Sequence, residues 1–277
     1  MTDMTSAGFV TAPAAARQRK QGSSNYGLIS LVSVAIILGV WSAASLAGLM
    51  SPSVFPAPWD ILKALYRLIT VGFTGNTLQF HLLSSLGRFA AGFLLAAVIG
   101  VPLGLVMGWS PAVRNIVAPF FETFRFIAPL AWMPFAALWF GTGIGGPILI
   151  VFSGAFAACV INAFRGARLV DPVLLEASRV HGANAWRLMV DVLLPGALPS
   201  IFAGLRVSAA LAWQSLIGAE LIVASSGIGY LMVQGQGSFE TSIVFASMVS
   251  IGLVGLAIDI LLQFLSGRYG RNGADRS

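Results

Sequence analysis

The residues of this chain that could do chemistry are isolated polar side chains set inside long apolar runs. Glu122 and Arg125 are three positions apart, so they share one face of a helix and can pair. Ionisable and amide groups are costly in hydrocarbon, so such residues within an apolar segment are candidates for lining a solute pathway. The pathway candidates are Arg125, Trp132, Gln214, Ser215 and Glu220.

Each charged candidate also has a structural interpretation. The Glu122–Arg125 pair can simply stabilise its own helix, and Glu220 can bond amides of the following Ser225–Gly229 segment instead of lining an external gate. Trp132 belongs to an aromatic row at helical spacing that is more typical of packing. A structural role is also favoured for two further charges, Arg206 and Asp259.

Catalytic chemistry is not expected. The single cysteine, Cys159, lies in an apolar run and is interpreted as a small buried hydrophobic residue, so a disulfide framework and a cysteine metal site are excluded. The chain has no Gly-rich phosphate loop followed by Lys-Ser or Lys-Thr, so it is not expected to hydrolyse ATP itself. We therefore predict no catalytic residue, no metal ligand and no cofactor bound by this chain.

The elements that carry these residues follow from composition. The chain of 277 residues is 57% hydrophobic and 9% charged, whereas soluble domains are about one quarter charged. Six apolar segments are long enough to cross a bilayer. They are Gly27–Met50, Leu86–Met107, Asn115–Phe140, Pro147–Phe164, Pro199–Ile222 and Ser242–Leu265. The sequence predicts an all-α integral membrane protein with six transmembrane helices, the third bent by Pro129 and Pro134.

Basic residues give the predicted orientation. With both termini in the cytoplasm, the cytoplasmic segments hold eleven arginines and lysines, whereas the external segments hold only Lys63 and Arg67. This divides the chain into a cytoplasmic tail (1–26), a six-span transmembrane domain (27–265) that includes the 165–199 connection, and a second cytoplasmic tail (266–277). His81, before the second span, and His181 then lie on opposite sides of the membrane and cannot share a catalytic site. The basic residues are too scattered to indicate nucleic acid.

Two segments outside the spans have helical signals of their own. After Pro58, apolar residues recur at the spacing of an amphipathic helix, at Ile61, Leu62, Leu65, Leu68 and Ile69. This helix is expected either in the outer membrane interface or as a packing brace. In the longest cytoplasmic connection (165–199), Asp171-Pro172 is typical of a helix start and Gly182 of its end. A second helix, capped by Asn184, is expected to stop at Leu194-Pro195.

The spacing within this connection carries a family resemblance. Glu176-Ala177-Ser178 is followed after three residues by Gly182, and after nine more by Val192 and Leu194-Pro195. This resembles the coupling motif of the permease subunits of binding-protein-dependent type I ABC importers, with serine for the second alanine and valine for isoleucine. The resemblance implies that the loop docks on an ATPase. The implied ATPase-coupling residues are Glu176, Ala177, Ser178, His181 and Gly182.

Further stretches extend the resemblance over nearly the whole chain. They include Pro129–Trp132, Trp139–Gly143, Pro195–Pro199 and Ala219–Ile222. They are similar to the taurine, aliphatic-sulfonate and nitrate permease group. The first and third of these stretches are most similar to the taurine branch of that group. The resemblance implies a bacterial inner-membrane subunit that works as a homodimer with an ATPase dimer, which binds ATP and Mg, and with an external solute-binding protein.

The sequence leaves alternatives for the transported solute and for the energy source. The sequence does not separate taurine from alkanesulfonates, nitrate or a small heterocycle. An autonomous secondary transporter is a remote alternative, because few carboxylates lie at mid-membrane and no internal repeat is evident.

Overall fold

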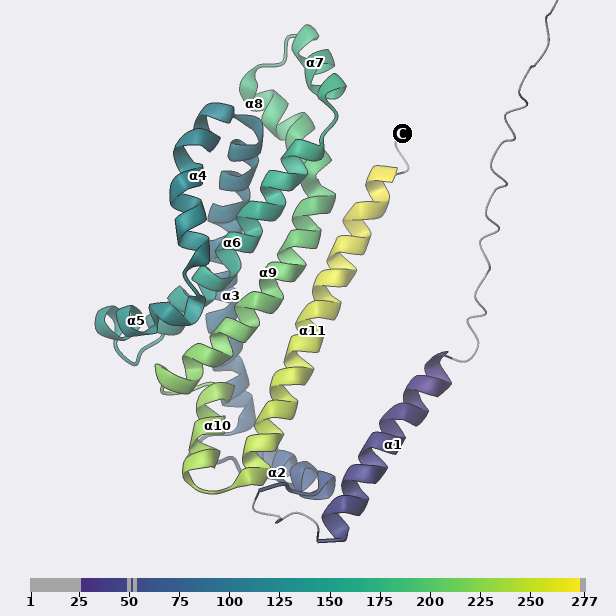
Figure 1. Ribbon diagram of the computed structural model, residues 1–277, viewed down its shortest axis with the longest axis vertical. Helices are drawn as coiled ribbons and strands as arrows, with labels where there is room; N and C mark the ends of the chain where they lie inside the picture. The colour runs from purple at the N-terminus through teal and green to yellow at the C-terminus, as the bar shows by residue number, and fades with distance from the viewer. Residues whose placement is uncertain (1–25, 49–50, 52–53, 275–277) are drawn as a thin grey trace, which may run out of the picture.

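The computed structural model describes residues 26–48, 51 and 54–274, which form a bundle of helices with the first helix standing to one side of it (Figure 1). The predicted basic N-terminal tail and the last three residues lie outside the described residues. The elements are α1 (Tyr26–Leu46), α2 (Pro58–Thr70), α3 (Leu78–Trp109), α4 (Pro111–Phe126), the 3-10 helix η1 (Pro129–Trp132), α5 (Met133–Phe140), α6 (Gly145–Leu169), α7 (Pro172–Val180), α8 (Ala185–Arg187), the π-helix η2 (Leu188–Leu193), α9 (Leu194–Ile222), α10 (Ile228–Gly237) and α11 (Thr241–Ala274).

Four helical segments within the described residues are long and apolar enough to cross a membrane. They are α3, α6, the continuous run from α8 to the end of α9, and α11 as far as Gly267. The bent pair of α4 and α5 makes a fifth if it counts as one span, and residues 31–46 of α1 form a shorter apolar helix. The all-helical membrane fold is confirmed, while the count of six spans stays a prediction.

The centre of the bundle is a three-helix layer of α3, α6 and α9. Glycines let α3 approach α6 closely: a Cβ at Gly104 would meet the Val160 carbonyl and Ala163, and one at Gly92 would meet Val151. Small residues at a helix interface are the usual way in which membrane helices gain packing contact. On the other side of α6, α9 packs through Ala209, Ala212 and other buried residues of the same core. This layer is the frame that positions the polar side chains.

The third predicted span is not one helix. The chain breaks after Phe126, and α4 and α5 meet at 89°. Proline removes a backbone donor and forces the preceding residue out of the helical region, and Ala128, before Pro129, is extended (ψ 139°). The predicted bend is therefore confirmed, whereas the expectation of a single helix over Asn115–Phe140 is wrong.

Two other boundaries differ from expectation. α3 begins eight residues earlier than predicted, so His81 lies inside the helix and not before it. The second helix of the 165–199 connection does not stop at Leu194-Pro195, because α8, η2 and α9 run on without a break. The π-helical turn explains this: the Leu194 N–H bonds to the Met189 carbonyl, and the wider turn makes room for the ring of Pro195.

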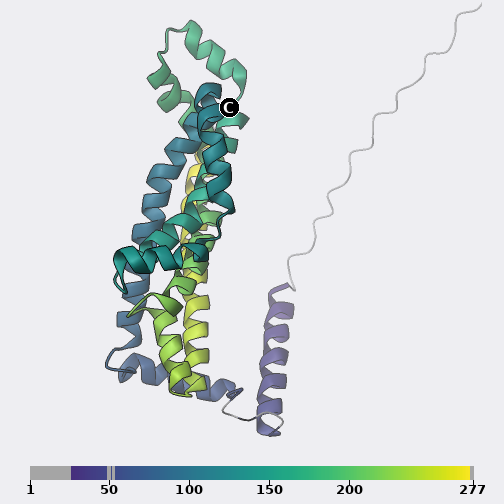
Figure 2. The same cartoon turned by 60° about the vertical axis from the view of Figure 1, so that its left-hand side comes forward.

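The two ends of the bundle carry different elements. α7 and α8 lie at one end, while α2 and α10 lie at the other, in both views (Figures 1 and 2). α2 packs Ile61, Ala64 and Leu68 against α10 and α11 and exposes Trp59 and Tyr66, so the predicted amphipathic helix is confirmed and braces the bundle. The N-terminal end of α1 and the C-terminal end of α11 both point to the α7 side (Figure 1).

Candidate functional site

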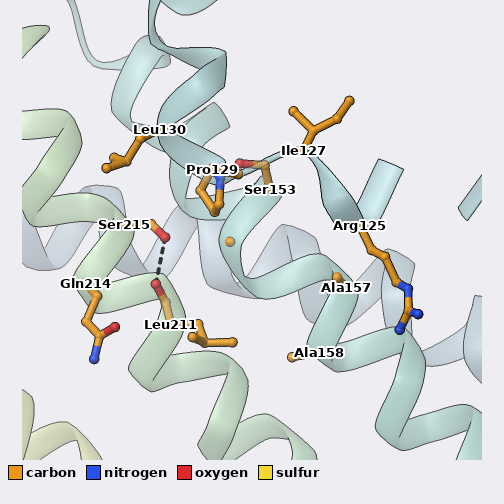
Figure 3. A pocket seen from close by; sticks show the side chains of 12 residues that line it. Arg125, Ile127, Pro129, Leu130, Ser153, Ala157, Ala158, Leu211, Gln214 and Ser215 are labelled. Carbon is orange, nitrogen blue, oxygen red and sulfur yellow. Dashed lines mark hydrogen bonds between the residues drawn. The ribbon is translucent and has the colours of Figure 1, made fainter. Parts of the chain in front are cut away.

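A cavity of about 410 Å³ opens between the end of α4, η1, α6 and α9 (Figure 3). We call it the central cavity. Its polar wall consists of Arg125, Ser153, Gln214 and Ser215, and its apolar wall includes Leu130, Ala157 and Leu211. The break between α4 and η1 is what brings residues 127–130 across the cavity, so the prolines that bend the third span also shape its wall.

Three of the five pathway candidates meet in this cavity. Gln214 has no hydrogen-bond partner for its side chain among the described residues, so its amide is free to bond a solute. Ser215 donates to the Leu211 carbonyl at 2.7 Å but keeps its oxygen lone pairs. Arg125 pairs with Glu122 at 2.6 Å, which confirms the predicted pair, and also lies on the cavity wall.

The other two candidates lie outside the cavity wall. Trp132 packs its ring against Phe124 and Phe135, and its Nε1 is buried without a hydrogen-bond partner among the described residues. Glu220 is only 1% exposed and faces α3 and the start of α10. Of the two interpretations of Glu220, the bonding of loop amides is the one that the geometry matches.

Glu220 is the centre of a buried polar cluster. Its carboxylate accepts bonds from the Ser85 hydroxyl at 2.8 Å, the Gly229 amide at 3.0 Å and Arg88 at 3.1 Å. Arg88 in turn donates to the hydroxyl of Ser226 at 2.7 Å. A buried charge is stable only when it is paired and hydrogen-bonded, and both charges here are. The cluster therefore fixes α3, α9 and the segment that enters α10 as one unit.

The segment that enters α10 is also tied to His81. The Gly227 amide donates to His81 Nδ1 at 3.2 Å, so that nitrogen is an acceptor and a neutral ring carries its proton on Nε2. Gly227 has φ +112°, and a Cβ at this position would meet the Glu220 carboxylate. Only glycine fits here, for both reasons.

A second ion pair joins α9 to α11. Arg206 bonds both carboxylate oxygens of Asp259, at 2.5 Å from Nε and 2.7 Å from the terminal nitrogen. Both side chains are about two-fifths exposed and line the grooves between the two helices. Sequence reasoning treated the two charges separately. Because charges within membrane segments usually pair with one another, this pair could have been suggested from the sequence.

At the α7 end, α7 and α8 form the predicted helix–turn–helix. Asp171 accepts a bond from the Val173 amide at 2.9 Å, and Asn184 accepts one from the Arg187 amide at 2.9 Å, so both predicted caps are confirmed. Gly182, with φ +78°, makes the turn between the helices. The sequence therefore folds locally as its cap residues indicate.

The helix–turn–helix exposes apolar side chains as well as polar ones. Val180 is 85% exposed and Trp186 74% exposed, and Val173 and Leu174 of α7 are also exposed. Glu176 and Ala177 are exposed on the same helix, and His181 Nδ1 lies 2.8 Å from the Ala177 carbonyl. Ser178 bonds its hydroxyl to the Leu174 carbonyl at 2.8 Å. An exposed apolar patch with charged neighbours is typical of a protein interface.

A helical membrane bundle with a cavity between its helices and an exposed helical hairpin at one end is an arrangement that suits the membrane subunit of a transporter. The sequence matches the family described as binding-protein-dependent transport system inner membrane component over residues 100–271. The chain belongs to this family of ABC importer permeases.

Three relatives show the breadth of the match. The chain is 36% identical to the taurine transport system permease protein TauC of Escherichia coli, covering 87% of this chain and 88% of that protein. It is 35% identical to the putative aliphatic sulfonates transport permease protein SsuC of Bacillus subtilis, over 91% and 90%. It is 32% identical to the nitrate import permease protein NrtB of Synechocystis, over 84% and 86%. The resemblance to this group of permeases is confirmed.

The fold has a solved counterpart. A chain of the MetNI methionine ABC transporter, determined in an inward-facing conformation, matches with a TM-score of 0.58 at 19% identity. The match covers 80% of this chain and 99% of that one. This likeness shows that the two chains share a fold.

Proposed function

We propose that this permease carries a small sulfonate-type solute, taurine first, across the bacterial inner membrane, after an external binding protein delivers it. ATP is hydrolysed by a separate ATPase dimer, which also binds the Mg ion. Alkanesulfonates, nitrate or a small heterocycle are the alternative solutes within the same importer class, since sulfonate and nitrate permeases match the chain about as well as the taurine permease does.

The observation that carries this proposal is the exposed hairpin of α7 and α8. It combines an apolar surface, the Glu176 carboxylate and a tight Gly182 turn, and it is continuous with α9, which lines the central cavity. Movement of the hairpin is thus transmitted directly to Gln214 and Ser215 on α9. We assign Glu176, Ala177, Ser178, His181 and Gly182 to the contact with the ATPase.

The proposed assembly contains two copies of this chain. The described chain has one hairpin of α7 and α8, so two copies are needed to engage both subunits of an ATPase dimer. Exposed apolar side chains next to the cavity, on α4 and α5, provide surface for the second copy or for lipid; they include Phe126, Leu138 and Trp139. We place the α7 end, and with it both termini, in the cytoplasm, in line with the excess of basic residues there.

The hairpin can be tested with Glu176→Ala in the transporter assembled with its ATPase and binding protein. Loss of this exposed carboxylate is expected to reduce solute uptake at least about tenfold, because a charged group of the ATPase would lose its partner at the interface. The permease is still expected to fold, because the carboxylate is exposed. The matched control is Glu240→Gln, which removes a partly exposed carboxylate at the opposite end of the bundle. Uptake and ATP hydrolysis are measured together, and equal uptake by both variants would remove Glu176 from the coupling contact.

A further inference from the structure

A second cavity, of about 270 Å³, lies along α4 between α3 and α6, and we call it the basic cleft. Its charged wall consists of Arg114, Arg125 and Arg165, together with Glu122. Its remaining wall is largely apolar and includes Met107, Phe121, Val160 and Phe164. Three arginines and one glutamate give the wall of the cleft an excess of positive charge.

Two of the three arginines of the cleft have no carboxylate partner in the part of the chain that the structure describes. Glu122 is paired with Arg125, whereas Arg114 and Arg165 make no ion pair with a carboxylate among the described residues. A guanidinium presents five N–H donors in a planar fork that matches the oxygens of a phosphate, sulfate or carboxylate. A counter-anion in the cleft would satisfy these donors.

The position of the cleft connects two regions of the molecule. Arg125, in the last turn of α4, lies on the wall of both the central cavity and the basic cleft. Arg114, in the first turn, is eleven residues away, about 16 Å along the helix axis, towards the α7 end. Arg165 lies in the last two turns of α6, at the same end. The wall of the cleft therefore runs from Arg125, which it shares with the central cavity, towards the side on which α7 lies.

We propose that the basic cleft binds a small oxyanion, of the sulfonate or sulfate type, as it leaves the central cavity towards the α7 side. This exit role rests on the proposed function, whereas the binding site itself requires only the arginines and their cleft. The Glu122 carboxylate competes with the anion for Arg125, which keeps binding weak enough for release, as conduction requires. A phosphate of a lipid headgroup has the same chemistry and is the other possible source of the ligand.

The test uses the full chain with its ATPase, reconstituted in nanodiscs of phosphatidylcholine, with radiolabelled sulfate as the probe. Wild-type protein is expected to bind sulfate saturably. Arg114→Gln/Arg165→Gln is expected to weaken binding about tenfold or more, because hydrogen bonds to charged groups are lost. Arg114→Lys/Arg165→Lys keeps the charge without the fork and is expected to fall in between. The control is Arg168→Gln, an exposed arginine of α6 outside the cleft wall, with binding unchanged within about twofold.

The outcomes separate this site from the transport function. Absence of saturable binding, or equal binding by the wild type and the double glutamine variant, overturns the site even if ATP-driven uptake is normal. Displacement of sulfate by added phosphatidylglycerol assigns the site to a lipid phosphate and overturns the exit role. Sulfate binding that depends on Arg114 and Arg165 and withstands the lipid supports the proposal. Absence of ATP-driven uptake in the wild type, with sulfate binding intact, counts against the proposed function alone.

Discussion

Arg88 and Glu220 are the most deeply buried charges of the described chain, with side chains 5% and 0% exposed. Removing one member of a buried pair leaves the other charge uncompensated, whereas removing both together is far better tolerated. The pair holds the entry to α10 through Ser226 and Gly229, so its loss is expected to loosen that end of the bundle first.

The prediction is that Glu220→Gln lowers the free energy of unfolding by about 3 kcal/mol or more, because Arg88 is left buried without a counter-charge. Heat-induced loss of the monodisperse protein in detergent measures the effect. Arg88→Met/Glu220→Met is expected to recover part of the loss. Glu240→Gln, which breaks a partly exposed pair with Arg67, is the control and is expected to cost about 0.5 kcal/mol or less. Similar losses for the two single variants would contradict the structural role of the cluster.

Short-range pairs could be predicted from the sequence, and long-range pairs could not. The spacing of three residues predicts the contact of Glu122 with Arg125, which the structure confirms at 2.6 Å. Arg88 and Glu220 are separated by 132 residues, and Arg206 and Asp259 by 53. Helical periodicity says which residues share a face but not which helix that face meets, so these partners emerge only from the tertiary fold.

Elements whose signals lie in their own few residues were predictable. The caps at Asp171 and Asn184 and the turn at Gly182 are local, and so is the apolar stripe of α2. The uninterrupted run from α8 into α9 was not, because Pro195 indicates a helix end unless a π-helical turn accommodates it. The central cavity was only partly predictable: the sequence supplies Arg125, Gln214 and Ser215, while the wall from residues 127–130 requires the 89° bend.

The contact of α3 with α6 gives a prediction for the element. Gly104→Ala is expected to destabilise the bundle by about 1–3 kcal/mol, because the new methyl group would overlap Ala163 at 2.8 Å and the Val160 backbone. Gly252→Ala, in α11 with no atom within 4 Å, is expected to be neutral or to stabilise by up to about 1 kcal/mol through helix propensity. Thermal stability in detergent compares the two. Equal effects of the two substitutions would show that the glycines of α3 are not needed for packing.

At the scale of the whole molecule, the bundle separates two tasks. The Glu220 cluster ties α3, α9 and α10 together at the end opposite α7, while the exposed hairpin at the α7 end continues directly into α9. Under the proposed function, the tied end would stay fixed while the hairpin end moves, which is what alternating access to one cavity requires. Gln214 and Ser215 lie on α9 between the two, so under the proposed function a movement imposed at α7 is expected to reach the cavity before it reaches the cluster.

The measurement that tests this account most directly is uptake of labelled taurine into proteoliposomes that hold the chain with its ATPase and binding protein, with ATP inside. The account predicts uptake that requires all three proteins and ATP, and that unlabelled taurine inhibits better than alkanesulfonate or nitrate. Strong ATP-dependent uptake of one of the competitors in place of taurine would change only the solute. Uptake that proceeds without the ATPase would contradict the central claim that the chain is the membrane subunit of an ATP-driven importer.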